Sequence, residues 1–220
     1  MVVDWLWDFG DGNTSTEKNA TYQYNSSGFY HVTLKVMDDD GDSDTHSKLI
    51  PVGFDLYYLQ DLSSGWNFIS LPFNESIDKS DLLMKYDTDF YEINYLFGWN
   101  RLIQSYEFAD VLHPGYGYWL YSSSDGELWI VDIHMDYDTY ITTVEEGWNI
   151  MGLPYYNLVD KTDVLVDDES WDTAVSNGWI SDYLFDWDET GQTYVFSDTF
   201  IPTEAYWLYA YQPCVLKRNS

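Results

Sequence analysis

The groups best placed for chemistry in this sequence are the acidic side chains of DDDGDSD, at residues 38–44. Ca²⁺ takes six to eight hard oxygen ligands, and closely spaced aspartates on a turn supply several of them. We therefore expect Asp38, Asp40 and Asp42 to be calcium ligands. The alternative is a hairpin turn whose carboxylates are solvated. The segment does not read as an EF-hand, because Gly41 in the sixth place would put Val36 at the first ligand position.

The motifs that mark enzyme active sites are missing from the sequence. It contains no HExxH, no GxSxG and no glycine-rich phosphate loop. Two carboxylates could serve a glycosidase, but with 38 acidic residues such pairs arise without function. We therefore predict no catalytic residue, no cofactor other than calcium, and no enzymatic activity. The scattered histidines are expected to be structural or exposed, and they are His31, His46, His113 and His134.

Aromatic rings are the most abundant candidate binding groups, since Phe, Trp and Tyr make up 20% of the chain. Such rings suit half-buried strand faces, and they also form contact surfaces for sugars and proteins. Tryptophans that lie outside the matched blocks described below, Trp171 among them, are the better candidates for exposure. The candidate binding residues are Trp99, Tyr116, Tyr118, Trp129, Trp179 and Trp187.

Four Asn-x-Ser/Thr sequons provide candidate glycosylation sites, which would fit a surface protein. They begin at Asn13, Asn19, Asn25 and Asn74.

Net charge and cysteine content narrow the class of protein. The formal net charge of −29 repels nucleic acid and anionic membranes, so we expect neither as a partner. No apolar run of about 18 residues is present, so no transmembrane helix is expected. The single cysteine, Cys214, allows no internal disulfide and is expected to be a small apolar side chain near the end of the last strand.

An internal repeat organises residues 54–220. GWNFISLP begins at Gly65 and GWNIMGLP at Gly147, 82 residues later. GYWLY at 117–121 is matched by AYWLY at 205–209, an offset of 88, so the second copy carries about six extra residues. A third block, IDKSDLL at 77–83, is matched by VDKTDVL at 159–165. Three blocks matched in the same order indicate duplication. We expect the repeated tryptophans to be anchors of buried cores, and they are Trp66, Trp119, Trp148 and Trp207.

Each repeat reads as strands with a short helix. In the first octet Trp66 and Phe68 point to one face while Ile69 and Leu71 point to the other, as in a strand buried on both faces. DKSDLLMKY, from Asp78, predicts an N-capped short helix. Residues 90–108 predict a hairpin around Gly98–Asn100, and residues 113–132 predict two strands joined through SSSDG.

Residues 1–53 read as β throughout. Strands are expected over Asp4–Phe9, Phe29–Met37 and Thr45–Val52. WDFGDG at 7–12, YQY at 22–24 and GFYHVTLKVMD at 28–38 resemble the polycystic kidney disease (PKD) domain. The resemblance implies an immunoglobulin-like β-sandwich that serves as a non-catalytic extracellular module.

The resemblance starts inside the PKD pattern, because the opening strands are missing. A sandwich without them exposes apolar faces and open edges. We expect the chain to be a fragment of a longer protein, which would also account for the lack of a signal peptide. The alternative is that another strand completes the sandwich.

These observations predict a mainly β chain: a partial immunoglobulin-like sandwich at 1–53 and two tandem β-rich repeats at 54–140 and 141–220. The repeats also resemble GWN…LP/GYW repeats of archaeal and bacterial cell-surface proteins, which implies an extracellular or cell-surface location. We expect a non-catalytic module for adhesion, for protein or glycan binding, or for spacing. The alternative is a substrate-binding accessory region of a secreted hydrolase.

Overall fold

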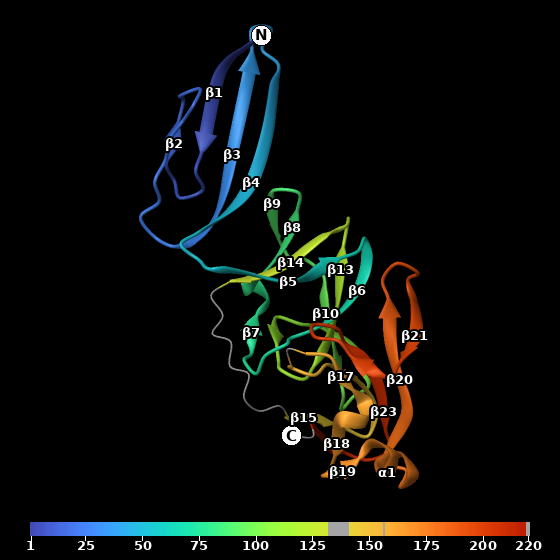
Figure 1. The fold of residues 1–220 in the computed structure, drawn as a ribbon. Helices are drawn as coiled ribbons and strands as arrows, with labels where there is room; N and C mark the ends of the chain where they lie inside the picture. Colours follow the sequence, from blue (N-terminus) through green and yellow to red (C-terminus); the bar gives the residue numbers. More distant parts are fainter. Residues whose placement is uncertain (132–140, 156, 219–220) are drawn as a thin grey trace.

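The computed structural model describes residues 1–131, 141–155 and 157–218. Strands make up 58% of the chain and helices 6%, so the mainly β prediction is confirmed. The N-terminal sheet stands at one end of the molecule, and the two repeats follow one another away from it (Figure 1).

The N-terminal part forms the expected strands. They are β1 (Val2–Asp8), β2 (Thr14–Ser15), β3 (Gly28–Asp38) and β4 (Ser43–Val52). All three predicted strands of this part lie within or next to these elements. On β3 the side chains of Tyr30, Val32, Leu34 and Val36 are half-buried, and the Tyr30 ring stacks on Tyr24 at a centroid distance of 4.0 Å.

The first repeat begins with β5 (Leu56–Leu62), β6 (Gly65–Ser70) and β7 (Ile77–Asp78), and the 3₁₀ turn η1 (Lys79–Asp81) follows. Its later strands are β8 (Leu82–Tyr86), β9 (Asp89–Glu92), β10 (Leu96–Asn100), β11 (Ser105–Phe108), β12 (Val111–Leu112), β13 (Gly117–Ser122) and β14 (Gly126–Val131).

The second repeat begins with β15 (Ile141–Val144), β16 (Gly147–Met151), β17 (Val159–Asp160), the 3₁₀ turn η2 (Lys161–Asp163), β18 (Val164–Val166) and β19 (Glu169–Ser170). Helix α1 (Trp171–Ser176) occupies the extra residues of this copy. The chain continues through β20 (Ile180–Asp188), β21 (Thr193–Ser197), β22 (Thr199–Phe200), β23 (Tyr206–Ala210) and β24 (Cys214–Arg218).

Both repeats have the same antiparallel layout. In the first, β11-β10-β13-β6 form one sheet and β9-β8-β14-β5 a second; in the second, β21-β20-β23-β16 and β19-β18-β24-β15 correspond to them. The second sheet of the first repeat continues through a β9–β4 pairing at Leu49 and Phe90 into the N-terminal strands, which makes it eight-stranded. A two-stranded ladder, β7-β12 or β17-β22, completes each repeat.

The matched octets form strands that are buried on both faces, as predicted. Ile69 and Leu71 belong to the core of the first repeat, whereas Phe68 and Trp66 face a separate cluster shared with the second repeat. In the second copy Ile150 belongs to the same shared cluster. Trp66, Trp119 and Trp207 therefore anchor the contact between the repeats and not two separate cores. The burial predicted for Trp148 is wrong, because this side chain is 40% exposed and lies outside the shared cluster.

The Asn of each GWN has a structural task. Asn67 accepts a hydrogen bond from the Ser63 N–H and donates to the Ser63 and Gly65 carbonyls. Asn149 repeats this pattern with Glu145 and Gly147. Both amides are fully buried, so each one closes the turn that starts its strand.

The predicted short helix is wrong over most of its length. Only the three residues of η1 are helical, and Leu82–Tyr86 forms strand β8. Pairing with β14 and β9 and the burial of Leu82, Leu83 and Met84 outweigh the helix propensity of these side chains.

The predicted hairpin is present, but its turn is displaced. β10 pairs with β11 from Asn100 to Ser105, so the turn covers residues 101–104 instead of Gly98–Asn100. The two strands joined through SSSDG are also present. They pair with different partners, β13 with β6 and β10, and β14 with β5 and β8, so this connection crosses from one sheet to the other.

No helix among the described residues has the length and apolar character needed to cross a membrane.

The buried Asn67 amide provides a test of the turn. Asn67→Asp removes both N–H donors and places a carboxylate where the side chain is fully buried. We expect a loss of about 3 kcal/mol or more in the free energy of unfolding, measured by urea denaturation. The same substitution at the exposed Asn25 is the control and should change stability by less than about 0.5 kcal/mol. Equal losses in the two variants would contradict the assigned role.

Candidate aromatic binding site

The candidate site is built by a reciprocal clamp between the repeats. Gln192 accepts a hydrogen bond from the Trp66 N–H at 3.0 Å and donates to the Trp66 carbonyl at 3.1 Å. Gln104 binds the backbone of Trp148 in the same way, at 2.8 and 3.1 Å. Each copy therefore binds the GWN strand of the other, β6 or β16, as in a two-fold symmetric dimer interface.

Backbone geometry supports the clamp. Gln104 and Gln192 both have positive φ, 52° and 48°, which costs energy for a residue with a side chain. Gly65 and Gly147 also have positive φ, and a Cβ atom there would come within 2.8 Å of the clamping glutamine. The repeated Gly is therefore required both by its own conformation and by the side chain of the other repeat.

Two tryptophan side chains reinforce the same carbonyls. The Trp99 indole N–H donates to the Trp148 carbonyl at 2.7 Å, and the Trp187 indole donates to the Trp66 carbonyl at 2.8 Å. Their rings meet Trp207 and Trp119 edge-to-face, both at 4.9 Å. Trp99 and Trp187 are thus equivalent residues of the two repeats. They are 88 residues apart in the sequence, as are the GYWLY and AYWLY blocks.

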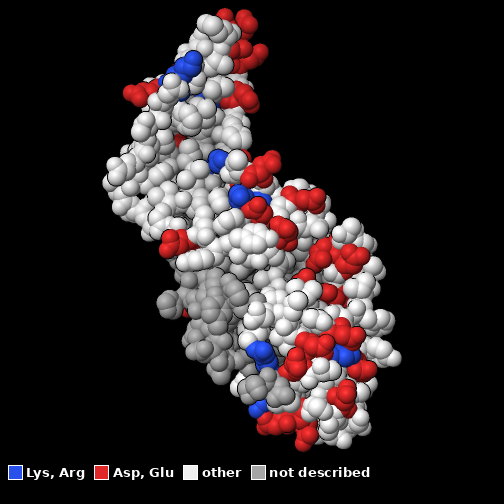
Figure 2. All heavy atoms as spheres, in the orientation of Figure 1, with Lys and Arg blue, Asp and Glu red and all other residues white. Residues whose placement is uncertain are grey.

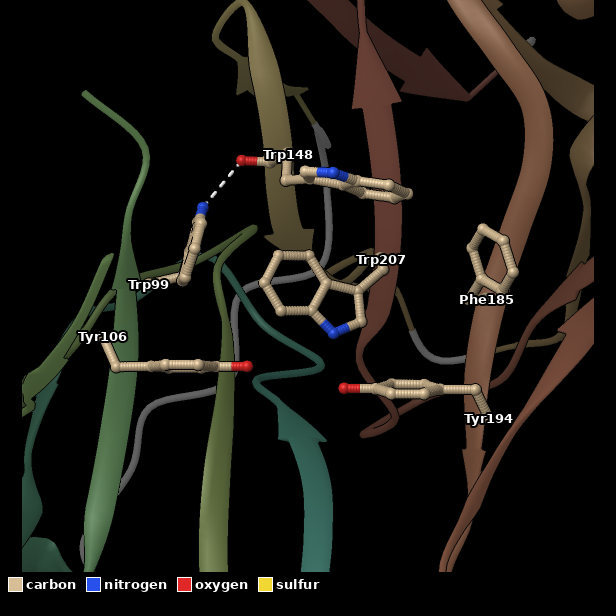
Figure 3. A pocket seen from close by; sticks show the side chains of 6 residues that line it. All are labelled: Trp99, Tyr106, Trp148, Phe185, Tyr194 and Trp207. Atoms are coloured by element: carbon tan, nitrogen blue, oxygen red, sulfur yellow. Dashed lines mark hydrogen bonds between the residues drawn. The ribbon is translucent and has the colours of Figure 1, made fainter. Parts of the chain in front are cut away.

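Two aromatic pockets result from this packing, each lined by rings from both repeats. The first, of about 340 Å³, is lined by Trp99, Tyr106, Trp148, Phe185, Tyr194 and Trp207 (Figure 3). The second, of about 390 Å³, is lined by Trp66, Phe97, Tyr106, Trp119, Trp187 and Tyr194. Exchanging each residue for its repeat equivalent converts one lining into the other. We call these the paired aromatic pockets.

Tyr106 and Tyr194 belong to both pockets. Their side chains point toward one another with the hydroxyl groups leading (Figure 3), and each residue is half exposed. Burial, followed by the neighbouring Tyr194, raises the pKa of Tyr106, although a hydrogen bond from the Trp119 indole opposes the shift. The Tyr106 hydroxyl therefore stays protonated at neutral pH and can donate a hydrogen bond.

Exposed rings extend the aromatic surface beyond the pockets. Phe196 and Phe108 are 69% and 67% exposed. Phe196 contacts Phe185 of the first pocket at 5.0 Å, and Phe108 contacts Phe97 of the second at 4.5 Å. An apolar surface of this kind suits contact with a ligand that is longer than one pocket.

The residues beside the pockets differ between the two repeats, so the two-fold symmetry does not extend to them. Arg101 is buried and donates to the Gly115 and Ile150 carbonyls, both at 3.0 Å, and its guanidinium lies over the Tyr116 ring. At the equivalent positions the second repeat has Glu189 and Glu204. These two carboxylates line a polar cavity of about 370 Å³ next to Gln60 and Thr203.

The carboxylates on this flank are partly buried. Burial, and then the charge of Asp186, raises the pKa of Glu204 to about 7. Burial also raises the pKa of Asp186 and of Glu189, and the charge of Asp186 adds to the shift at Glu189. One of these groups therefore carries a proton at pH values where an exposed carboxylate has none.

The candidate residues taken from the sequence are spread over the fold. Trp99 and Trp187 lie in the paired aromatic pockets. Tyr116 lies beneath Arg101, and Tyr118 is buried in the core of the first repeat with its hydroxyl bonded to the His113 N–H. Trp129 packs beside Phe90 where the first repeat meets the N-terminal strands, and Trp179 packs on the core of the second repeat.

The exposure predicted for Trp171 is wrong. Its ring is fully buried, because α1 turns it into the core of the second repeat against Phe200. Cys214 is buried, as expected of a small apolar side chain, but it lies at the start of β24 and not near the end of this strand.

Sequence reasoning missed the phenol and phenyl rings of the pockets, which are Tyr106, Tyr194, Phe97 and Phe185. A signal for them is in the sequence: both pairs are separated by 88 residues, like the GYW and AYW blocks. These rings lie in two further matched stretches, LFGWN at 96–100 with LFDWD at 184–188, and QSYEF at 104–108 with QTYVF at 192–196.

Comparison with known proteins identifies the N-terminal part. Residues 1–52 match the family model of the PKD domain. The chain is 57% identical to the pre-pro-metalloprotease PrtV of Vibrio cholerae over 51 residues. These residues make up 23% of this chain and 6% of that protein. The chain is 38% identical over 93 residues to collagenase ColA of Bacillus cereus, covering 42% and 9%, respectively.

A microbial collagenase of Vibrio alginolyticus is 55% identical over 40 residues, covering 18% of this chain and 5% of that protein. The chain thus spans less than a tenth of the length of these relatives. No solved structure matches it significantly. The PKD domain is a non-catalytic module.

The acidic turn of the PKD domain brings together a slightly different set of aspartates than predicted. Carboxylate oxygens of Asp38, Asp39 and Asp40 lie within 4.8 Å of one another, so Asp39 takes the place expected for Asp42. The Asp38 carboxylate also accepts hydrogen bonds from the Asp40 and Asp42 N–H groups, which shapes the turn.

The remaining candidates are surface features. The four sequon asparagines are exposed and lie outside the strands: Asn13, Asn19, Asn25 and Asn74. His31 and His46 are exposed on the PKD domain, and His113 is exposed beside Tyr116. His134 lies outside the described residues.

The raised pKa of Glu204 predicts a pH dependence of stability. Its pKa in the folded protein, about 7, lies above its ordinary value of 4.5, so the folded state binds more protons between these two pH values. Stability therefore falls as pH rises through this window. Glu204→Gln keeps an acceptor for the Tyr206 hydroxyl but cannot titrate. We expect the free energy of unfolding to drop by about 1–2 kcal/mol less between pH 5 and pH 8 in this variant than in the wild type, as measured by urea denaturation.

Glu146→Gln, at an exposed glutamate, should leave the pH profile as it is in the wild type. An unchanged profile in Glu204→Gln would show that this carboxylate is not desolvated.

Proposed function

We propose that this chain is a non-catalytic extracellular binding region that accompanies a secreted protease and holds protein through the paired aromatic pockets. The pockets themselves carry the proposal. Rings from both repeats are held in place by the clamp and are partly open to solvent, as in sites that bind by stacking and apolar contact.

The relatives support an association with proteolysis. PrtV is named a metalloprotease, and ColA and the Vibrio alginolyticus protein are named collagenases. Each is similar to this chain over a small share of its length, as expected for an accessory module. Four exposed sequons and an acidic surface that extends along the molecule (Figure 2) support an extracellular location.

A cell-surface adhesion module is the second candidate. It is favoured by the paired GWN and GYW blocks, which resemble repeats of surface proteins, and by the reciprocal packing that these blocks produce. Adhesion and substrate holding require the same exposed rings, so the identity of the ligand separates the two functions. Neither nucleic acid nor an anionic membrane is a suitable partner for a chain with a net charge of −29.

Binding to unfolded protein tests the proposal. We expect the immobilised chain to bind heat-denatured collagen and reduced, unfolded casein in biolayer interferometry, with no cleavage of either. Tyr106→Ala with Tyr194→Ala should weaken binding at least tenfold, because two rings shared by both pockets are lost. Both residues are half exposed, so the fold should be retained, which circular dichroism and thermal melting would check.

Tyr211→Ala is the matched control, at a tyrosine that is 56% exposed and lies outside both pockets. Binding that is insensitive to the Tyr106 and Tyr194 substitutions, or cleavage of the bound protein, would contradict the proposed function.

We also propose that the acidic turn of the PKD domain binds Ca²⁺ through Asp38, Asp39 and Asp40. Their clustered oxygens fit a hard cation, although they supply fewer than its six to eight ligands. With a dissociation constant typical of extracellular modules, 10 mM Ca²⁺ should raise the melting temperature by about 3 °C or more.

The variant Asp40→Asn should reduce this shift, whereas Glu17→Gln, at an exposed glutamate elsewhere in the PKD domain, should preserve it. An equal shift with Mg²⁺, or none with Ca²⁺, would remove the proposal.

A further inference from the structure

We infer that the paired aromatic pockets accept an extended, proline-rich polypeptide with basic flanks, bound as a polyproline II helix. This inference rests on the proposed function and specifies its ligand.

The composition of the lining favours an apolar, ring-bearing occupant. All residues that line the two pockets are aromatic, and the indole N–H groups of Trp99 and Trp187 already donate hydrogen bonds within the protein. A glycan needs partners for several hydroxyl groups, and unpaired hydroxyls at an apolar wall cost binding energy. Proline rings stack on aromatic faces without any such requirement.

The two central phenols supply the polar part of the recognition. Tyr106 and Tyr194 lie with their hydroxyls facing one another (Figure 3). Each hydroxyl group can both donate and accept a hydrogen bond, so the pair can supply a donor to the ligand. A polyproline II helix has no internal hydrogen bonds, so its carbonyl groups are free to accept.

The repeat symmetry matches a periodic ligand. The two pockets have equivalent linings, and the exposed Phe108 and Phe196 continue the surface at its two ends. Polyproline II has three residues per turn and a rise of about 3.1 Å per residue, so similar rings recur about every 9 Å along one side. Such a helix can offer like groups to like pockets, and it binds at a low entropy cost because it is already extended.

The acidic charge of this chain indicates which residues stand next to the proline run of the ligand. No Lys or Arg lines either pocket, and the formal net charge of the chain is −29. The acidic surface that Figure 2 shows would attract lysine or arginine next to the proline run and repel acidic segments.

Titration of intrinsic tryptophan fluorescence, confirmed by calorimetry, tests this ligand. The probes are a decaproline with two lysines at each end, the same decaproline with glutamate ends, a Gly-Ser peptide with lysine ends, and a chitin hexasaccharide. We expect saturable binding of the lysine-ended decaproline, and binding at least fivefold weaker for the glutamate-ended one at low salt. The Gly-Ser peptide and the hexasaccharide should show no saturable binding.

Tyr106→Phe combined with Tyr194→Phe keeps the rings and removes the donors. It should weaken decaproline binding about 3- to 10-fold, while Tyr211→Phe should not change it. A Gly-Ser peptide that binds as tightly as decaproline, binding of the hexasaccharide alone, or decaproline binding that survives Tyr106→Ala with Tyr194→Ala would each overturn the inference. If denatured collagen or casein binds through these tyrosines while decaproline does not, the proposed function stands and the ligand inferred here is wrong.

Discussion

The hydrogen bonds from Gln104 and Gln192 to the backbone of the opposite repeat are the constraint on which the rest of this structure depends. Each glutamine occupies both the N–H and the C=O of one tryptophan, Trp148 or Trp66, in a strand that no further strand of the same sheet covers. Together with the indole N–H groups of Trp99 and Trp187, the clamp pairs the N–H and C=O groups of both edge strands across the contact between the repeats. Because the backbone is paired in this way, the indole and phenyl rings around it can pack closely and still leave two pockets.

Duplication within one chain makes such an interface easy to form and free to diverge. A two-fold contact uses one surface patch twice, so each favourable substitution in a homodimer counts twice. Once both copies lie in one chain, the residues at equivalent positions can be substituted independently. Arg101 and Glu189 are the clearest case, since one binds carbonyl groups and the other joins a cluster of carboxylates. The residues that line the pockets are the same in both repeats, whereas the residues beside the pockets differ. This difference is expected if the pocket residues contact a ligand and their neighbours do not.

Much of the architecture could be predicted from the sequence, whereas the site could be predicted only in part. Period-two alternation placed the PKD strands, and the octets were correctly read as strands buried on both faces, because Phe68 and Ile69 are apolar on opposite sides. The pattern could not show that one of those faces belongs to another repeat. Leu82–Tyr86 carries helix-forming residues and becomes a strand, because long-range pairing with β14 decides its conformation. Tyr106 and Tyr194 were missed for a similar reason, since only the folded contact between repeats brings them together.

The join between the PKD domain and the first repeat determines how the pockets are presented. Leu49 of β4 pairs with Phe90 of β9, and an ion pair between Lys48 and Asp89 lies beside this contact. Leu49 is buried in a small cluster with Leu83, against which Phe29, Phe90 and Trp129 pack. A continuous sheet resists bending better than a flexible linker, because bending would break the hydrogen bonds between its strands. Only one pair of residues joins β4 to β9, so the apolar cluster must provide most of the stiffness. The tryptophan that appeared from the sequence to be a binding residue, Trp129, therefore helps to hold the pockets at a fixed distance from the PKD domain.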